Sequence, residues 1–141
     1  DNVDPSQYRK DIPIHRTYFH EIAQPSQIEN KLAEMLEYLK NGSNTAVHPI
    51  EFAANVHHRF MRVYPFTGTS GWIGRLLLNF VLLREGYLPV VIHSADRQTY
   101  YEALRGSERS FRQFLLETMD QSLSNTQKFI DTHWNREKRF A

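Results

Sequence analysis

Two apolar runs joined by a short loop are the feature that most constrains this chain. The first begins at Pro49, and its apolar residues recur at helical spacing, at Phe52, Ala53, Val56, Phe60 and Val63. Pro65 ends it at about Tyr64, because a residue that precedes proline is pushed out of the helical region. The second run extends from about residue 71 to residue 84 and is apolar around most of its circumference. Such a helix is expected to be central and buried.

The loop between the two runs is rich in small and hydroxyl residues. Gly68, Thr69, Ser70 and Gly71 come directly before the second helix. In one interpretation, their backbone N–H groups point into one concavity at the helix start and bind an anion or a phosphate. In the other, they form an ordinary Ser- and Gly-rich turn between helices. Local composition alone favours the ordinary turn.

The remaining sequence predicts an all-α domain of about five helices with a short N-terminal β-hairpin. Further helices are expected over about 26–41, 95–105 and 107–135, with an extended apolar connection at 88–92. The segment from Ile12 to Phe19 has the pattern of a hairpin or an extended flap, and Pro13 restricts such a strand to a sheet edge. We therefore divide this single domain into a lead-in and flap (1–24), a helical core (25–135) and a tail (136–141).

Composition limits the classes of function. The chain has 141 residues, 40% of them apolar, which suits one folded domain. Its net charge of +1 comes from scattered charges, so no basic patch for nucleic acid or a membrane surface is expected. Cysteine is absent, which excludes disulfides, thiolate catalysis and cysteine–zinc sites.

The sequence also bears on location. No run reaches the roughly 18 apolar residues of a membrane span, and no signal peptide is visible, which favours an intracellular location. The first residue is Asp1 rather than Met, so we expect a fragment of a longer protein. The sequence makes no prediction of the oligomeric state.

Motifs spread over most of the chain resemble the Fic domain family. Members typically read His-Pro-Phe-x-Asp/Glu-Gly-Asn-Gly-Arg, then two residues, then Arg-Leu-Leu-x-Asn. This chain has His-Pro-Ile-Glu-Phe-Ala-Ala from His48, Pro-Phe from Pro65 and Arg-Leu-Leu-Leu-Asn from Arg75. It also has Gly-Tyr-Leu-Pro from Gly86 and Arg-Gln-Thr-Tyr-Tyr from Arg97. The resemblance runs from about residue 8 to residue 130, implies a Fic-type helical fold, and is strongest to the subgroup that includes metazoan adenylyltransferases.

The resemblance implies an activity and a set of roles. Fic enzymes transfer AMP from ATP to a protein hydroxyl, with a motif histidine as general base and an acidic residue that holds Mg²⁺. ATP and Mg²⁺ are therefore the implied cofactors. Ile12 and Ile14 fall in the flap that pairs with the backbone of a target protein, so a protein partner is expected there. The alternative for this segment is an inert surface hairpin. Tyr100 and Tyr101 match aromatic positions beside the adenine pocket, and the alternative for these two tyrosines is plain helix packing.

Three chemical positions of the motif depart from the family pattern. Tyr64 stands where the base histidine is expected, and a phenol with a pKa of about 10 is mostly protonated at pH 7. Gly68 replaces the metal-binding carboxylate and supplies no ligand. Trp72 replaces the arginine that clamps phosphate, so a cation becomes a bulky indole. The base, the metal ligand and the clamp are all missing.

The rest of the motif is partly retained. Thr69 replaces a glycine whose missing side chain lets the backbone approach phosphate. Ser70 replaces asparagine but can still donate a hydrogen bond, and Gly71 is kept. Arg75 matches the second motif arginine. We expect it either to contact phosphate or to form a structural ion pair. The candidate nucleotide- and phosphate-binding residues are Ser70, Gly71, Arg75, Tyr100 and Tyr101.

The other histidines offer no direct replacement for the base. His57 lies seven residues before Tyr64, about 10 Å by helix rise, and is expected to be a hydrogen-bonded structural residue. His48 precedes Pro49 and is expected to be a capping or loop residue. His93 is the least implausible replacement, and no metal-binding spacing such as His-x-x-x-His occurs.

Three functions remain open on the sequence. The first is a degenerate, catalytically impaired Fic domain kept as a nucleotide-binding or protein-interaction module. The second is an active nucleotidyltransferase with an altered site that uses Tyr64, Ser70 or His93. The third is a purely structural segment of a larger protein. Loss of a general base alone typically costs about 10²–10⁴-fold in rate, which favours the first.

Overall fold

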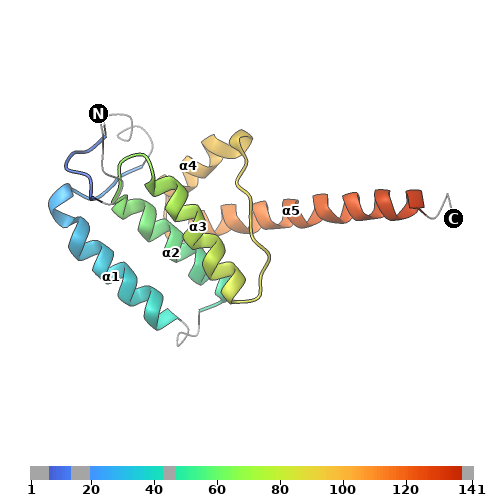
Figure 1. The fold of residues 1–141 in the computed structure, drawn as a ribbon, viewed down its shortest axis with the longest axis horizontal. Coiled ribbons are helices and arrows are strands. Elements are labelled where there is room, and N and C mark those ends of the chain that lie inside the picture. The colour runs from blue at the N-terminus through green and yellow to red at the C-terminus, as the bar shows by residue number, and fades with distance from the viewer. Residues whose placement is uncertain (1–6, 14–19, 43–46, 138–141) are drawn as a thin grey trace.

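The computed structural model describes residues 7–13, 20–42 and 47–137 and has an all-α fold (Figure 1). Its elements are η2 (Pro25–Gln27), α1 (Ile28–Asn41), α2 (Pro49–Val63), α3 (Ser70–Arg84), η4 (Ser94–Asp96), α4 (Arg97–Arg105) and α5 (Glu108–Glu137), where η marks a 3-10 turn. The predicted all-α class with five helices is confirmed for the described residues, which contain no strand. Ile12 and Pro13 lie in irregular backbone, and residues 14–19 of the predicted flap, including Ile14, are outside the described residues.

Helix α2 is the centre of the fold. It packs against α1, α3 and α5, and ten of its 15 residues are buried. Its polar side chains are satisfied inside the protein. Asn55 donates a hydrogen bond to the Tyr38 hydroxyl of α1 at 3.3 Å, and His58 Nε2–H donates to the Gly106 carbonyl before α5 at 3.2 Å. Hydrogen bonds to two different parts of the chain thus help a helix with mixed polarity occupy the core.

The prediction that α3 would be the central, buried helix is wrong. One side of α3 is buried, at Ser70, Gly74, Leu78, Val81 and Leu82. The opposite side exposes four large apolar side chains, at Trp72, Leu76, Phe80 and Leu83. Apolar periodicity reports which side chains are hydrophobic, and it cannot tell a buried helix from a surface helix whose outer face is apolar as well.

A close contact between α2 and α3 depends on a glycine. A Cβ atom at Gly74 would lie 2.8 Å from the Met61 sulfur and 3.3 Å from Cε1 of His57. A larger residue would therefore force Met61 and His57 to shift, and glycine lets the two helices pack at this distance without such a shift. The contact holds α3, and therefore the loop before it, against the end of α2.

The connection from α3 to α4 is held by an asparagine. Asn79 Nδ2 donates to the Val90 carbonyl at 3.1 Å, and its Oδ1 accepts from the Val90 N–H at 2.8 Å. This pair of bonds is the pattern that a neighbouring β-strand would make. It explains the predicted extended segment at residues 88–92, which runs beside α3 in Figure 1.

Helix α5 begins in the core and leaves it. Its first turns pack on α2 and α4, where Phe111, Phe114 and Leu115 are buried. Its C-terminal part projects away from the other helices (Figure 1). Among the described residues, no helix combines the length and the apolar character needed to cross a bilayer.

Candidate functional site

The chain reverses direction sharply at Tyr64, the first position of the motif loop. Tyr64 is the C-cap of α2, has φ 47° and ψ 61°, and donates its N–H to the Phe60 carbonyl at 2.9 Å. This left-handed conformation is uncommon for a residue other than glycine, so surrounding contacts must stabilise it. One such contact is a 2.7 Å hydrogen bond from Nε of Arg9 to the Tyr64 carbonyl.

Arg9 is a buried cation that satisfies the end of α2. Its side chain is 4% exposed, and its terminal nitrogens donate to the carbonyls of Asp11 (3.1 Å), Val63 (3.2 Å) and Ala23. Its backbone N–H donates to the Pro65 carbonyl at 2.9 Å. The last carbonyls of a helix have no partner within the helix, and the fork of guanidinium donors supplies one here. No sequence pattern indicates this role, because Arg9 stands in a polar lead-in without periodic spacing of apolar residues.

Two further residues of the N-terminal segment continue this cap. His20 Nε2–H donates to the Met61 carbonyl at 2.8 Å, and the Ala23 N–H donates to the Arg62 carbonyl at 2.8 Å. The described parts of residues 8–23 therefore bind the carbonyls of the whole last turn of α2. They fix the direction in which the motif loop leaves that helix.

The Tyr64 side chain is part of the core rather than the surface. It is 0% exposed, and its ring lies edge-on to His20 at 6.3 Å between centroids. His20 in turn stacks on Tyr101 at 6.1 Å. In this structure the fully buried Tyr64 ring is a packing residue of the core.

Ser70 closes the motif loop on itself. Its Oγ donates to the Phe66 carbonyl at 2.8 Å and accepts from the Phe66 N–H at 2.7 Å, and the residue is fully buried. The predicted donor is therefore already engaged within the loop. The backbone N–H groups of Ser70 and Gly71 donate to no other described residue.

Arg75 lies against this first turn of α3. One of its guanidinium nitrogens would be 3.6 Å from a Cβ atom built on Gly71. Arg75 is half-buried, and no ion pair joins it to a described carboxylate. The fold thus brings together three of the predicted phosphate-binding residues: the N–H groups of Ser70 and Gly71 and the guanidinium of Arg75.

The resemblance implies a metal ligand at Gly68 and a phosphate clamp at Trp72, and the structure describes these residues and Thr69 between them. Gly68 has φ 78° and open space around its Cα, and Thr69 buries its Oγ1 without a hydrogen-bond partner in the described structure. Trp72 is 72% exposed. Within residues 7–13, 20–42 and 47–137, no three His, Asp or Glu side chains are grouped to hold a metal ion. A hard cation such as Mg²⁺ requires oxygen ligands, so these residues do not fit the implied Mg²⁺.

His57 is structural, as predicted. Its Nδ1–H donates to the Gly74 carbonyl of α3 at 2.7 Å, which leaves Nε2 to accept from the Tyr100 hydroxyl of α4 at 3.0 Å. Its ring also stacks on Phe111 of α5 at 4.8 Å. Burial lowers the pKa of His57 from 6.5 to about 4, against the opposing effect of the Gly74 hydrogen bond and with a smaller lowering by the charge of Arg75. Neutral His57 therefore joins four helices at one point.

The two predicted adenine-side tyrosines differ in exposure. Tyr100 is 3% exposed and uses its hydroxyl on His57, so it is a packing residue. Tyr101 is half-buried and borders a cleft of about 570 Å³ along the outer side of α4. His93 is exposed and lines a different cleft, of about 190 Å³, between residues 91–99 and α5. No residue of the motif loop lines the cleft at His93.

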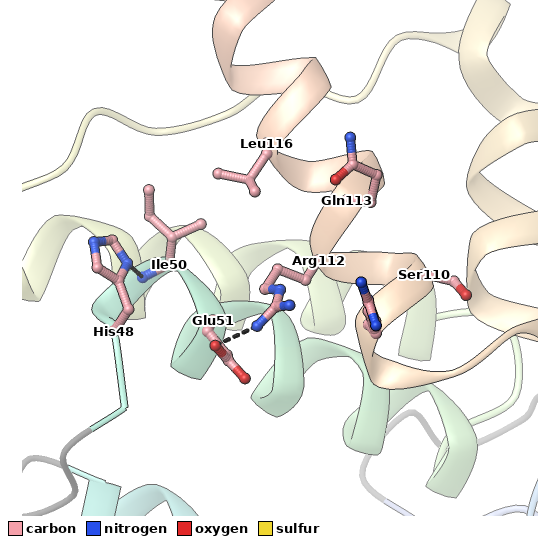
Figure 2. A pocket seen from close by; sticks show the side chains of 8 residues that line it. His48, Ile50, Glu51, Ser110, Arg112, Gln113 and Leu116 are labelled. Atoms are coloured by element: carbon pink, nitrogen blue, oxygen red, sulfur yellow. Dashed lines mark hydrogen bonds and ion pairs between the residues drawn. The ribbon is translucent and has the colours of Figure 1, made fainter.

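A wider cleft of about 850 Å³ lies at the other end of α2, between its start and that of α5. Figure 2 shows that His48 Nδ1 accepts the Ile50 N–H (3.3 Å), which confirms the predicted cap, and that Glu51 pairs with Arg112. Helix α2 has 15 residues, or about 22 Å at the helical rise per residue, so this cleft is far from the motif loop.

Comparisons with known proteins agree with this geometry. The family model for the Fic/DOC family matches residues 1–82. Protein adenylyltransferase Fic of Nematostella vectensis is 36% identical over 110 residues, which cover 72% of this chain and 26% of that protein. Protein adenylyltransferase fic-1 of Caenorhabditis briggsae is 34% identical over 107 residues, with 75% of this chain and 21% of that protein covered. The chain thus spans about a quarter of the length of these relatives.

Solved structures share the fold. A Fic domain containing signaling protein from Bacteroides thetaiotaomicron superposes with a TM-score of 0.70 at 26% identity, over 84% of this chain and 52% of that chain. A variant of Fic-1 from Caenorhabditis elegans superposes with a TM-score of 0.71 at 28% identity, over 79% of this chain and 35% of that chain. With the family model matched over more than half of its residues, the chain belongs to the Fic/DOC family.

Proposed function

We propose that this chain is a Fic domain that does not transfer AMP and that retains weak phosphate or nucleotide binding at the start of α3. The observation that carries the proposal is the burial of Tyr64, at 0% exposure, in the position of the general base. A group that is inaccessible, and whose unperturbed pKa is about 10, cannot accept a proton from a substrate at neutral pH.

The neighbouring positions support the loss of chemistry. Gly68 supplies no metal ligand, and Trp72 supplies no cation to the phosphates. Transfer from a nucleoside triphosphate depends on charge neutralisation and positioning as much as on a base. Replacing three of these functions at once should therefore reduce the rate far more than the loss of the base alone.

Residual anion binding is supported by a smaller set of groups. The N–H groups of Ser70 and Gly71 face no other described acceptor, and the positive end of the α3 dipole lies at the same place. The Arg75 guanidinium lies over Gly71 without a carboxylate partner among the described residues. Backbone donors and a guanidinium together suit a phosphate group.

Calorimetry with ATP, ADP, AMP and inorganic phosphate tests the binding part of the proposal. We expect millimolar binding that weakens at least tenfold in Arg75→Gln, because a hydrogen bond to a charged group contributes about 1.5–3 kcal/mol. Arg109→Gln is the matched control, since Arg109 is an exposed arginine outside the motif loop. Absence of heat with every ligand, or equal losses in both variants, would refute binding at this site.

The alternative function is an active nucleotidyltransferase with an altered site. Its best candidate base is His93, which is exposed to solvent. Labelled AMP on the chain or on lysate proteins, lost in His93→Ala, would establish this alternative. A protein partner bound through the flap around Ile12 and Ile14 stays a prediction, which a pull-down with residues 11–19 scrambled would test.

A further inference from the structure

Helix α3 presents an apolar stripe to solvent. The stripe consists of Trp72 (72% exposed), Leu76 (69%), Phe80 (57%) and Leu83 (57%). The spacings of four, four and three residues place all four side chains on one side of the helix. We call these four residues the α3 stripe. Asn79 holds the backbone of Val90 beside the helix.

The exposed apolar area of the α3 stripe matches the apolar area that one partner buries in a standard protein–protein interface. Four large side chains at about two-thirds exposure present roughly 500 Å², taking about 150–250 Å² for each. A standard interface buries about 800 Å² on each partner, and homodimer interfaces are about 65% apolar. The apolar part of such an interface is therefore about 500 Å², which the stripe supplies by itself.

The order of side chains along the stripe is complementary to itself. In an antiparallel pair of α3 helices, Trp72 of one copy meets Leu83 of the other, and Leu76 meets Phe80. Both pairings share one midpoint, at about residue 78, so a single two-fold axis satisfies both, and the same contacts occur twice. In a parallel pair, each side chain would meet its own copy, with Trp72 against Trp72 and Leu83 against Leu83.

We propose that the α3 stripe binds a second copy of this chain, with the two α3 helices antiparallel across a two-fold axis. The proposal does not depend on the proposed function. It has a consequence for the motif loop, because Trp72 is at once a stripe residue and the residue in the clamp position. Association would bury Trp72 and cover one side of the first turn of α3 in each copy.

Sedimentation equilibrium of the 141-residue chain tests the association. We expect a concentration-dependent dimer whose dissociation constant rises at least 100-fold in Leu76→Glu. Leu123→Glu is the matched control, because Leu123 is 52% exposed and lies on α5 rather than on α3. Circular dichroism checks that each variant is folded. A wild-type chain that stays monomeric up to about 1 mM would overturn the proposal, because a dissociation constant of about 1 mM corresponds to only about 4 kcal/mol of binding free energy. An equal effect of Leu123→Glu on the dissociation constant would also overturn it.

Cross-linking tests the arrangement, and the absence of cysteine in the chain makes it direct. Trp72→Cys and Leu83→Cys are prepared singly and treated with a short bismaleimide, alone and mixed. The antiparallel pairing predicts at least fivefold more cross-linked dimer in the mixture than in either variant alone. Cross-linking of Trp72→Cys to itself at the higher yield would show a parallel pair and would refute the two-fold arrangement.

Discussion

The neutrality of His57 predicts that acid weakens this fold in a defined way. In the folded chain the pKa of His57 is lowered to about 4 by burial, whereas in the unfolded chain it returns to about 6.5. Between these values the unfolded state binds one more proton than the folded state. The free energy of unfolding therefore falls as the pH falls through this window. Above about pH 7, the contribution of His57 to this free energy no longer changes with pH.

The size of the effect follows from the two pKa values. Each pKa unit corresponds to about 1.4 kcal/mol, so His57 alone should lower the free energy of unfolding by about 2–3 kcal/mol between pH 7.5 and pH 4.5. The pKa of His58 is also lowered by burial, with smaller opposing effects from its hydrogen bond to Gly106 and from Glu108. His58 adds to the loss in the same direction.

Urea unfolding at several pH values, followed by circular dichroism, measures this loss. His57→Phe keeps an aromatic ring beside Phe111 but cannot titrate, so its pH dependence should be smaller than that of the wild type by about 2–3 kcal/mol. At pH 7.5 the variant should already be less stable by about 1–3 kcal/mol, because the Tyr100 hydroxyl loses its acceptor. His93→Phe, at an exposed histidine, is the control. An unchanged pH dependence in His57→Phe would refute the assignment of His57 as a buried neutral base.

Three other substitutions test contacts that position the motif loop and the connection from α3 to α4. Arg9→Lys should destabilise the fold by about 2–4 kcal/mol by urea unfolding, because an ammonium cannot replace the guanidinium fork at several carbonyls; stability equal to wild type would contradict the cap. Asn79→Asp should cost about 1–3 kcal/mol, since it removes the donor to the Val90 carbonyl and places a carboxylate there, whereas wild-type stability would mean that the connection is held otherwise. Gly74→Val should cost about 1–3 kcal/mol by overpacking, and Gly71→Ala, where an added Cβ meets Arg75 at an ordinary contact distance of 3.6 Å, should cost far less; equal costs would argue against the close contact of α2 and α3.

The sequence predicted the order of helices because its signals are local. Pro49 and Pro65 bound α2 and Gly86 follows α3, and the apolar spacing between them is helical. Which helix is central could not be predicted in this way. Polar residues of α2 such as Asn55 and His57 argue against burial by composition, yet partners from distant segments satisfy them.

The sequence predicted a set of candidate site residues, and the structure shows how these residues are placed. The motif resemblance placed the loop at residues 64–75, and the structure brings Ser70, Gly71 and Arg75 to one helix start. Nothing in the sequence indicated that the Ser70 hydroxyl turns inward to Phe66. The role of Arg9 is likewise set by a contact across 55 residues of chain, which no local pattern records.

The most direct test of the central claim is incubation with ATP labelled at the α-phosphate and Mg²⁺, followed by detection of label on the chain and on lysate proteins. The comparison is a variant that restores the family motif, with Tyr64→His, Gly68→Asp, Thr69→Gly, Ser70→Asn and Trp72→Arg. The account predicts no label with the wild-type chain and label with the restored variant, because the missing chemistry lies in the loop while the scaffold is kept. Label transferred by the wild-type chain would contradict the account.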